Sequence, residues 1–553
     1  MRKSSIFAIL IAVCTLAGCN TGVIDSTVPP EDPSQKEEKV KPAEWATVYG
    51  VVSCEGKGIK GAVVSDGCKV VLTDGNGVYN IASEKRLKYV FISIPSGYEV
   101  ASDGVLPRMS VRLTKDAKET ERVDFELFEQ DQSSYSMLYF GDMHLAARSF
   151  CRDIQQFRDF TADVKDYMAA NKGRCYAMTL GDMSWDYFWT ANGYDLNSYL
   201  KEINGDLGGL QIFHTMGNHD NDSSFSGDFD GASTFHRIIG PSYYSFNIGG
   251  THYIVLDAIE YFNSPAGERN FRSQVTREQI DWMVRDIACV DKKAPIVVTM
   301  HTPLYRRDGT GALSNMWDLI KNFDGFDRVQ FVTAHTHVVY NVDMLHRSVH
   351  VYENNSGAVC GAWWMSGCNY PGLHIGTDGA PGGYRVMEFK GKEMTTFFKA
   401  AGRPAEHQFR VYDRNCICLD AQLWLPDAST ADKAEFTRTA GEYAKPSTAN
   451  EILINVWDYD PSWKISVTEN GRELSVTQVK GARDPLYLLA YEAYEYDNGW
   501  DISYPSSTFD HMFKATASSP SSTVEVKVTD RYGRVFTERV ARPRPFEPGT
   551  YLP

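Results

Sequence analysis

The chain has 553 residues, and because single hydrophobic cores stop growing near about 250–300 residues, we expect roughly two to four domains. Hydrophobic residues make up 43% of the chain and charged residues 23%, which is ordinary for a folded protein and excludes wholesale disorder. The formal net charge of -15 argues against a nucleic-acid binder that works through a general basic surface. An anionic substrate would have to be attracted locally, for example by bound cations.

The first residues have the pattern of an export signal. Two basic residues precede an apolar run over residues 6–16, which is too short to span a bilayer as a permanent helix. The run ends in Leu16-Ala17-Gly18-Cys19, which resembles a bacterial lipoprotein cleavage site. The resemblance implies that residues 1–19 are a signal peptide and that Cys19 carries the lipid that anchors an exported protein in the bacterial cell envelope. An ordinary secretory signal with a chance cysteine is the alternative.

Residues 20–45 are polar and mixed in charge, a composition that predicts a linker from the membrane and no folded core. Of the 11 cysteines, Cys14 and Cys19 fall in the predicted signal peptide. The rest are odd in number and spread over a large chain, so a disulfide scaffold is not expected. Cys54 and Cys68 would pair only if adjacent strands brought them together, and we treat the cysteines as structural.

Residues 46–130 contain short β-rich runs separated by turn residues, and they predict a small β-sandwich. The turn sequence Asp74-Gly75-Asn76-Gly77 lies between runs at 70–73 and 78–81, a pattern that predicts a β-hairpin. The stretches Gly61-Ala62-Val63-Val64 and Thr73 to Tyr79 resemble the carboxypeptidase-regulatory, transthyretin-like modules of exported bacterial proteins.

From residue 135 to about 400, apolar strands alternate with amphipathic helices. Apolar side chains recur at helical spacing over 151–171, and a second helix is expected around 280–287. Apolar runs predict strands at 136–140, 176–180, 296–300 and 329–333. This alternation predicts an α/β domain over residues 135–400. Residues 405–553 return to short strands and aromatic-rich turns, and we expect a third, all-β domain there.

Five polar clusters follow apolar strands, where the loops that build functional sites emerge. They are Asp142 with His144, Asp182, the run Asn218-His219-Asp220, His301, and His335 with His337. Carboxylate, imidazole and amide groups bind divalent ions such as zinc, manganese or iron. A shared aspartate would let two ions lie about 3.5–4 Å apart and contact both the attacking and the leaving oxygen. The spacing of two in the first and last clusters points both side chains the same way if the backbone is extended.

In this order the five clusters resemble the motifs of the calcineurin-like metallophosphoesterase superfamily. Those motifs are Asp-x-His, Gly-Asp, Gly-Asn-His-Asp or -Glu, a lone His, and Gly-His-x-His. Each motif alone is weak, but five in one order are specific. The resemblance covers about residues 136–400 and implies that family's α/β fold, a two-sheet β-sandwich core flanked by helices. One departure is Ala334, where glycine is usual, and it changes the backbone freedom before the last pair of histidines.

The resemblance also implies a role for each residue. One metal ion would be held by Asp142, His144 and His337, and the other by Asn218, His301 and His335, with Asp182 bridging the two. His219 would contact the scissile phosphate and protonate the leaving oxygen, while Asp220 would orient that imidazole and keep it protonated. The nucleophile would be a hydroxide bound to the two metal ions.

The activity implied is metal-dependent hydrolysis of a phosphate ester, and we expect a phosphodiester. A phosphomonoesterase would have the same motifs, so that alternative stays open. A different class is a non-catalytic cell-surface protein with an idle site, whose flanking β domains bind glycan or protein. The complete ligand set argues against it.

Weaker candidates follow the last motif. Trp363, Trp364 and Tyr384 lie in aromatic and glycine-rich stretches that could shape a substrate pocket. Tryptophan pairs fill cores equally often, so both interpretations stay open. Asp186 is a candidate partner of the site that the sequence does not settle, and the remaining histidines are assigned to structure.

Overall fold

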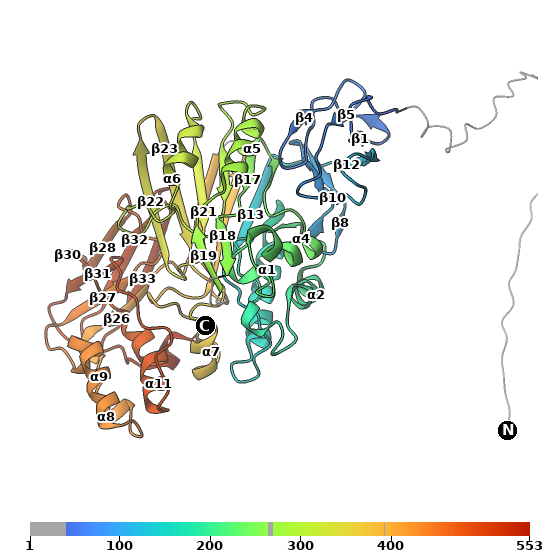
Figure 1. Cartoon of the computed structure of the whole chain (residues 1–553). Helices are drawn as coiled ribbons and strands as arrows, with labels where there is room; N and C mark the ends of the chain where they lie inside the picture. The colour runs from blue at the N-terminus through green and yellow to red at the C-terminus, as the bar shows by residue number, and fades with distance from the viewer. Residues whose placement is uncertain (1–39, 264–268, 392, 553) are drawn as a thin grey trace, which may run out of the picture. The chain divides into compact units, whose positions relative to one another are not determined.

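The computed structural model describes residues 40–263, 269–391 and 393–552 (Figure 1). The predicted signal peptide, including Cys19, and most of the predicted linker lie outside the described residues. Within the described part, every helix is too short or too polar to cross a membrane. From Pro42 onward the chain forms one compact unit.

The N-terminal β region, residues 46–130, consists of two small sheets and a short hairpin. The first sheet contains β1 (Val48–Cys54), β2 (Lys57–Gly58), β5 (Val78–Ile81), β7 (Tyr98–Val100), β11 (Glu121–Arg122) and β12 (Phe125–Glu129). The second contains β3 (Val63–Ser65), β4 (Val70–Leu72), β6 (Tyr89–Ser93) and β10 (Ser110–Arg112). The hairpin is β8 (Ser102–Asp103) with β9 (Leu106–Pro107). These sheets agree with the predicted all-β character of this region.

The predicted hairpin at residues 74–77 is wrong, although the turn itself forms. The Asp74 carboxylate accepts the backbone N–H of Val78 at 2.9 Å and closes the turn. The strands on either side pair with different partners, because β4 joins β3 whereas β5 joins β1. The turn residues therefore reverse the direction of the chain. The strand that β5 pairs with is decided by the burial of Tyr79 and Ile81, which favours β1 of the other sheet.

The central region, residues 135–400, is built on two mixed sheets. The first has the order β15-β14-β13-β24-β25, with bounds β13 Ser134–Phe140, β14 Arg174–Thr179, β15 Ile212–Phe213, β24 Gly383–Lys390 and β25 Glu393–Ala400. The second has the order β16-β17-β20-β21-β23-β22, with bounds β16 Tyr244–Ile248, β17 Thr251–Val255, β20 Ile296–Thr299, β21 Val329–Thr333, β22 Val339–His346 and β23 Val349–Ser356. A separate hairpin joins β18 (Ile259–Asn263) to β19 (Arg269–Ser273). Strands β13, β14 and β15 are parallel, as are β17, β20, β21 and β23.

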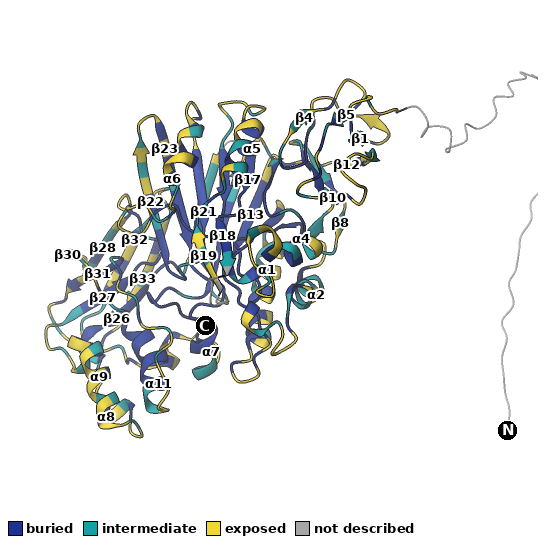
Figure 2. Ribbon diagram, in the orientation of Figure 1, coloured by how far each residue is buried: buried dark blue, intermediate teal, exposed yellow. Residues whose placement is uncertain are grey.

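The two central sheets pack face to face with helices outside, which is the predicted fold class. Tyr135 on β13 contacts Tyr253 on β17 through hydroxyl groups 2.8 Å apart. The opposite face of β13 presents Phe140, which packs edge-on against Phe160 of α1 at 5.2 Å between ring centres. Alternation of side chains along β13 thus serves both the inter-sheet core and the helix layer. Figure 2 shows these central strands buried.

The helices of the central region flank the sheets. They are α1 (Asp153–Ala170), α2 (Leu196–Leu207), α3 (Asp228–Gly231), α4 (Ser233–Ile238), α5 (Arg277–Ile287), α6 (Met316–Ile320) and α7 (Met365–Asn369). The two longest that periodicity predicted, α1 and α5, are confirmed within a few residues. Helix α5 begins where the Thr276 side chain accepts the N–H of Gln279, an N-cap that satisfies an otherwise unpaired donor.

The C-terminal region, residues 405–552, is a pair of four-stranded sheets. One has the order β26-β27-β31-β30, with bounds β26 Arg410–Asp413, β27 Glu451–Asn455, β30 Val476–Val479 and β31 Met512–Thr516. The other has the order β29-β28-β32-β33, with bounds β28 Lys464–Glu469, β29 Arg472–Leu474, β32 Val524–Thr529 and β33 Val535–Val540. The connections also hold helices that the sequence patterns did not indicate, namely α8 (Ala421–Trp424), α9 (Thr430–Ala440), α10 (Pro485–Tyr487) and α11 (Tyr494–Asp497), with a π-helical turn at Leu488–Ala493.

Candidate metal centre

The predicted ligand residues lie on loops at the carboxyl ends of parallel strands. In the first sheet, Asp142 and His144 follow β13, Asp182 follows β14 and Asn218 comes after β15; in the second, His301 follows β20, and His335 and His337 follow β21. Among the described residues, the fold gathers three sets of histidine and aspartate side chains, and within each set the ligand atoms all lie within 4.8 Å of one another. Two sets are the predicted metal groups, the first Asp142, His144 and His337 and the second Asp182, His301 and His335, and the third joins His144, Asp182 and His219. This edge of the two sheets is where α/β folds usually build their sites.

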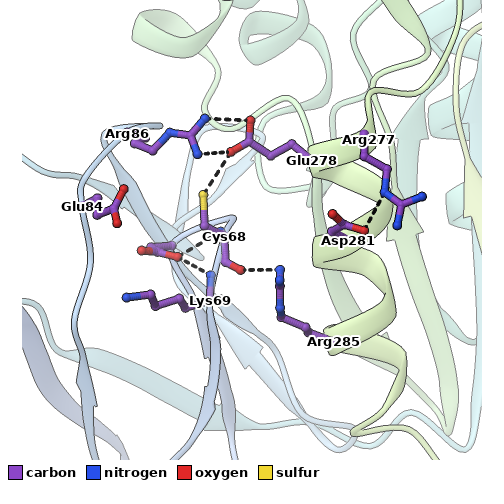
Figure 3. Close-up of a pocket in the computed structure, with 9 residues that line it drawn as sticks. Cys68, Lys69, Glu84, Arg86, Arg277, Glu278, Asp281 and Arg285 are labelled. Carbon is purple, nitrogen blue, oxygen red and sulfur yellow. Dashed lines mark hydrogen bonds and ion pairs between the residues drawn. The ribbon is translucent and has the colours of Figure 1, made fainter.

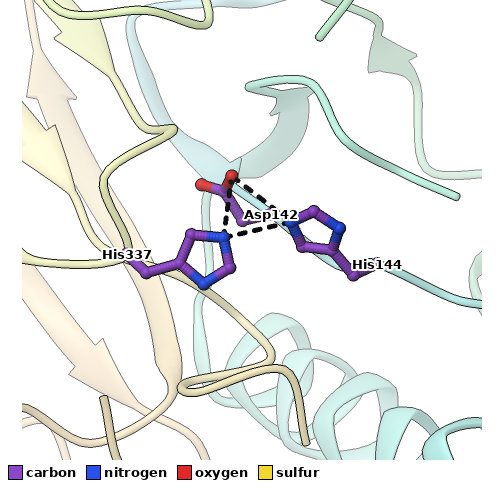
Figure 4. A group of neighbouring side chains, drawn as sticks. All are labelled: Asp142, His144 and His337. Atoms are coloured by element: carbon purple, nitrogen blue, oxygen red, sulfur yellow. Dashed lines mark hydrogen bonds and ion pairs between the residues drawn. The ribbon is translucent and has the colours of Figure 1, made fainter. Parts of the chain in front are cut away.

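The first group converges on one point (Figure 4). His337 Nε2 lies 3.0 Å from His144 Nε2 and 3.3 Å from Asp142 Oδ1. Asp142 Oδ1 is buried without a hydrogen-bond partner. His337 Nδ1 donates to the Gly361 carbonyl at 3.0 Å, so Nε2 is the ring atom that faces the other two side chains. Two imidazole nitrogens and a carboxylate oxygen at these distances require a cation among them, either a proton or a metal ion, and these ligand types fit a divalent metal ion.

The ligand atoms of the second group also converge. His301 Nδ1 donates to the Leu180 carbonyl at 2.7 Å, so Nε2 is the ring atom that faces the rest of the group. That nitrogen lies 3.0 Å from Asn218 Oδ1 and 3.0 Å from His335 Nδ1. Imidazole nitrogens and an amide oxygen that face one another suit a metal ion with mixed nitrogen and oxygen ligands.

Asp182 connects the two groups. Its Oδ2 lies 3.2 Å from His301 Nε2 and 3.6 Å from His144 Nε2. Its Oδ1 accepts the backbone N–H of His219 at 2.7 Å. One oxygen is therefore fixed by the backbone, and the other occupies the position that a bridging ligand would take between two ions.

The buried carboxylates of this centre need positive charge close to them. Burial alone would lower the pKa of His301, but the adjacent Asp182 carboxylate raises that pKa to about 9. Burial and the charge of His301 lower the pKa of His335 to about 4. A proton on His301 thus opposes a second one on His335. Divalent ions would supply the positive charge that the buried aspartates require.

The backbone at the ligands is left-handed and not extended. The φ angle is 48° at Asp142, 44° at His144, 51° at Asp182, 69° at His335 and 55° at His337. The condition of extended backbone, under which spacing alone would align the side chains of the first and last clusters, is therefore not met. Such conformations cost about 1–3 kcal/mol each for residues other than glycine, persist only where surrounding structure imposes them, and cluster at functional sites.

Two small residues let these loops approach one another. A Cβ at Gly217 would lie 2.3 Å from Asp182 Oδ1, so only glycine allows the bridging aspartate to sit against this loop. Ala334, which stands where glycine is usual, does not have a positive φ. Its side chain faces Gly141, where an added Cβ would approach it to 2.9 Å. The departure at Ala334 is therefore matched by the glycine opposite, and the adjacent histidines still join the two groups.

The predicted contact between Asp220 and the His219 imidazole is wrong. The Asp220 carboxylate accepts the backbone N–H groups of Asp182, Met183 and Gly217 at 2.8, 3.1 and 2.9 Å. The carboxylate at the imidazole belongs to Asp186, whose Oδ1 lies 2.7 Å from His219 Nδ1. The prediction chose Asp220 because it is adjacent to His219 in the sequence. In the structure Asp220 lies in a 3₁₀ turn that directs its side chain back onto the loop backbones.

The predicted substrate pocket is wrong for two of its three residues. Trp364 is buried, and its indole N–H donates to the Met143 carbonyl at 2.8 Å. Tyr384 is buried in β24 beside Phe140, and its hydroxyl donates to Asp163 at 3.0 Å. Both are core residues. Trp363 alone borders the centre, where its indole stacks on the His337 ring.

Sequence reasoning missed other residues near the centre. Trp185 and Tyr187 each place a ring centre 5.8 Å from that of His219, and Tyr187 is 65% exposed. Their position just after the Gly-Asp motif was an available signal. Tyr504 also reaches the centre, through Trp363, and nothing in its local sequence marks it.

The described cysteines are all free, so Cys54 and Cys68 do not pair. A cleft of about 630 Å³ lies between the N-terminal β region and α5 (Figure 3). Four of its charged groups form ion pairs, Arg86 with Glu278 at 2.8 Å and Arg277 with Asp281 at 2.9 Å. The cleft therefore mixes charges of both signs, in contrast to the converging ligand atoms of the metal centre.

Comparisons with known proteins agree with this geometry. A family model described as calcineurin-like phosphoesterase matches residues 135–339. Models for the N terminal and the C terminal of calcineurin-like phosphoesterase match residues 46–130 and 353–536. No curated protein matches the sequence.

Solved structures show a more distant similarity. A dimetal phosphatase from Danio rerio is 12% identical with a TM-score of 0.35, over 48% of this chain and 96% of that one. A purple acid phosphatase from yellow lupin (Lupinus luteus) seeds is 14% identical with a TM-score of 0.33, over 49% and 52%. A 5'-nucleotidase from Candida albicans is 12% identical with a TM-score of 0.26, over 49% and 53%.

Proposed function

Because the chain belongs to the calcineurin-like phosphoesterase family, we propose that it hydrolyses a phosphodiester at a centre of two divalent metal ions. The observation that carries the proposal is the position of Asp182 Oδ2, 3.2 Å from His301 Nε2 and 3.6 Å from His144 Nε2. When bound, the two ions would neutralise the ester oxygens and make a water acidic enough to serve as nucleophile near neutral pH.

The side chains divide into ligands and a proton donor. The first ion would be held by Asp142, His144 and His337, the second by Asn218, His301 and His335, and both by Asp182. His219 is half-buried at the mouth of the centre, with Nδ1 engaged by Asp186. With the ring oriented by Asp186, His219 would protonate the leaving oxygen through Nε2. Asp220, in turn, holds the loops of Asp182 and Gly217 together.

The choice of a diester follows the expectation from the sequence, and a phosphomonoesterase with the same ligands is the alternative. A diester carries one negative charge, whereas a monoester near neutral pH carries almost two, so a pair of matched substrates separates the two activities.

The test is hydrolysis of bis(p-nitrophenyl) phosphate and p-nitrophenyl phosphate by chelator-treated protein, before and after addition of Mn²⁺, Zn²⁺ or Fe²⁺. We expect cleavage that depends on metal, with the diester preferred. Asp182→Ala should abolish hydrolysis and lower the bound metal, while Asp166→Ala, on the exposed face of α1, should change neither.

The outcomes separate the alternatives. Preference for the monoester would replace the proposed diesterase by a phosphomonoesterase. Two bound ions without cleavage of either ester would favour the non-catalytic cell-surface protein that binds glycan or protein. Retained activity in Asp182→Ala would contradict the bridging role.

The proposal includes a location, an exported protein held in the cell envelope by lipid at Cys19. It is supported by the basic start, the short apolar run and the Leu16-Ala17-Gly18-Cys19 sequence. In a bacterial host, labelled fatty acid should be incorporated into the full chain and not into Cys19→Ala. Equal labelling of the two proteins would contradict lipidation at this residue.

A further inference from the structure

The C-terminal region reaches the metal centre through the 498–511 loop, the residues between α11 and β31. Tyr504 on this loop stacks on Trp363, with ring centres 3.9 Å apart and 13° between planes. Trp363 in turn stacks on His337, at 3.9 Å and 18°. The indole therefore lies between a candidate metal ligand and a residue that is more than 160 positions later in the chain.

The polar contacts that hold His337 act at a single ring atom. Nδ1 donates to the Gly361 carbonyl at 3.0 Å and lies 3.7 Å from the Cys360 sulfur. Because both contacts are at Nδ1, the stacked face of Trp363 is what opposes a tilt of the ring about that atom. The Nε2 of His337 is the atom that faces His144 and Asp142, so a tilted ring would withdraw a ligand from the first ion.

Trp363 does not hold its position by local preference. Its φ is 50°, a left-handed conformation that costs about 1–3 kcal/mol outside glycine and must be imposed by neighbours. Arg148 Nη2 donates to the Trp363 carbonyl at 2.9 Å and fixes the backbone. The indole is fixed by its stacks, and Tyr504 covers the face opposite His337. The indole cannot swing away from His337 without displacing Tyr504.

Tyr504 is itself held from behind. The Tyr487 hydroxyl donates to the Tyr504 carbonyl at 2.7 Å, and the Tyr504 N–H donates to the Tyr491 hydroxyl at 3.3 Å. Both of these tyrosines are buried. Tyr491 lies on the π-helical turn Leu488–Ala493, a rare conformation that is frequent at functional sites. A continuous series of contacts therefore links the C-terminal core to the metal centre, through Tyr504, Trp363 and His337.

We infer that Tyr504 is a positioning residue of the metal centre, which through Trp363 holds His337 as a ligand of the first ion. The inference rests on the two-ion centre of the proposed function. It makes the C-terminal region a determinant of metal affinity at one of two ions. Residues that orient a metal ligand typically change metal affinity by about 10–100-fold when they are removed.

The experiment titrates Mn²⁺ into the chelator-treated full chain by calorimetry and records electron paramagnetic resonance of the loaded protein. In Tyr504→Ala we expect one of two Mn²⁺ equivalents to bind at least about tenfold more weakly, with the other unchanged. The spectrum of a coupled ion pair should give way to that of a single ion. Tyr504→Phe keeps the stacked ring and should restore both equivalents.

The matched control is Tyr459→Ala, which removes the same side chain from the C-terminal region at a position that packs on Phe513. It should bind both ions as the wild type does. Tyr504→Leu, which keeps apolar bulk, guards against loss of folding and should also weaken one equivalent. Both equivalents bound at wild-type affinity in Tyr504→Ala and Tyr504→Leu, or both weakened equally, would overturn the inference. A wild-type protein that binds two ions and cleaves no ester would refute the proposed function but not this inference.

Discussion

The two flanking β regions contact opposite edges of the central sheets. The N-terminal β region lies at the amino ends of the strands, where Glu99 pairs with Arg174 at the start of β14 at 2.8 Å. The C-terminal region lies at the carboxyl ends, where the Tyr504 ring stacks on Trp363 beside the metal centre. Loops at the amino edge carry none of the predicted ligands. Position along the strand direction therefore decides which flanking region can influence chemistry.

The two seams also differ in the character of their contacts. The N-terminal seam near α5 uses half-exposed ion pairs such as Arg86 with Glu278, whose side chains are 58% and 37% exposed. The C-terminal seam uses a buried pair, Arg385 with Asp458, whose side chains are 0% and 3% exposed. Exposed pairs contribute little, whereas breaking a buried pair leaves an unpaired charge in the interior. We expect the C-terminal seam to be the one that cannot be altered without large effects.

The largest expected effect is on stability at the C-terminal seam. Asp458→Ala removes the carboxylate that accepts from Arg385 at 2.7 and 3.2 Å and leaves a buried guanidinium unpaired. We expect a loss of about 3–5 kcal/mol in the free energy of unfolding, measured by urea denaturation. A double variant, Arg385→Met with Asp458→Leu, should recover much of it. A loss below about 1 kcal/mol would place this pair with the exposed pairs of the other seam.

A substitution inside the metal centre gives the effect of a change that involves neither flanking region. Asp186→Asn removes the carboxylate at His219 Nδ1, and we expect kcat to fall by about 10²-fold with bound metal and Tm unchanged. Asp220→Asn should instead lower metal binding, because that carboxylate accepts three backbone N–H groups. Identical profiles for the two variants would contradict the separate roles. Steady-state kinetics and metal analysis provide the comparison.

The N-terminal seam should tolerate change. Glu278→Gln breaks the pair with Arg86, and we expect at most about 1 kcal/mol of lost stability with kcat unaltered. Arg86→Gln is the matched partner variant. A fall in kcat for either one, at temperatures where the protein stays folded, would mean that the N-terminal β region is coupled to the centre and would break the contrast between the two seams.

The smallest effect concerns acid stability of the N-terminal β region. Burial opposes ionisation of Glu121, but the N–H groups of Thr114 and Lys115 and the Lys85 ammonium outweigh it and lower the Glu121 pKa from 4.5 to about 2. Because the folded value is the lower one, the stabilisation is complete above pH 4.5 and is lost as the pH falls toward 2. Glu121→Gln should flatten the stability curve across that interval, as followed by circular dichroism. A curve that keeps the wild-type slope would exclude this carboxylate as the cause.

Much of the fold was predictable from residue pattern. The predicted helix at 151–171 is α1, and the predicted strand at 329–333 is β21 with the same bounds. These two were predictable because the spacing of apolar residues in a continuous run shows which side chains are buried. The hairpin at residues 74–77 failed because a turn fixes the reversal of the chain but not the strand partner. Helices α8, α10 and α11 were missed because each has only three or four residues. Helix α9 is longer but buries only Phe436 and Ala440, so its sequence has no apolar period.

The candidate ligands were predictable for a related reason. Motifs such as Gly217-Asn218 combine a chemical group with the close approach of two loops that it needs, since a Cβ at Gly217 would collide with Asp182. The partner of His219 was not predictable in this way. Asp220 is adjacent to His219 in the sequence, whereas Asp186 is 33 residues away. Only the folded loops direct the Asp220 carboxylate onto backbone N–H groups and bring Asp186 to the imidazole.

By itself the sequence determined the chemistry of this protein, because the residue types, their order and their positions after apolar strands are local properties. The tertiary structure alone decided which atoms meet. It turned the ligand backbone left-handed, placed Asp182 Oδ2 between the two groups, and carried Tyr504 to Trp363 across the domain seam. Those contacts join residues far apart in the chain, and they depend on packing between sheets and loops that no local pattern encodes.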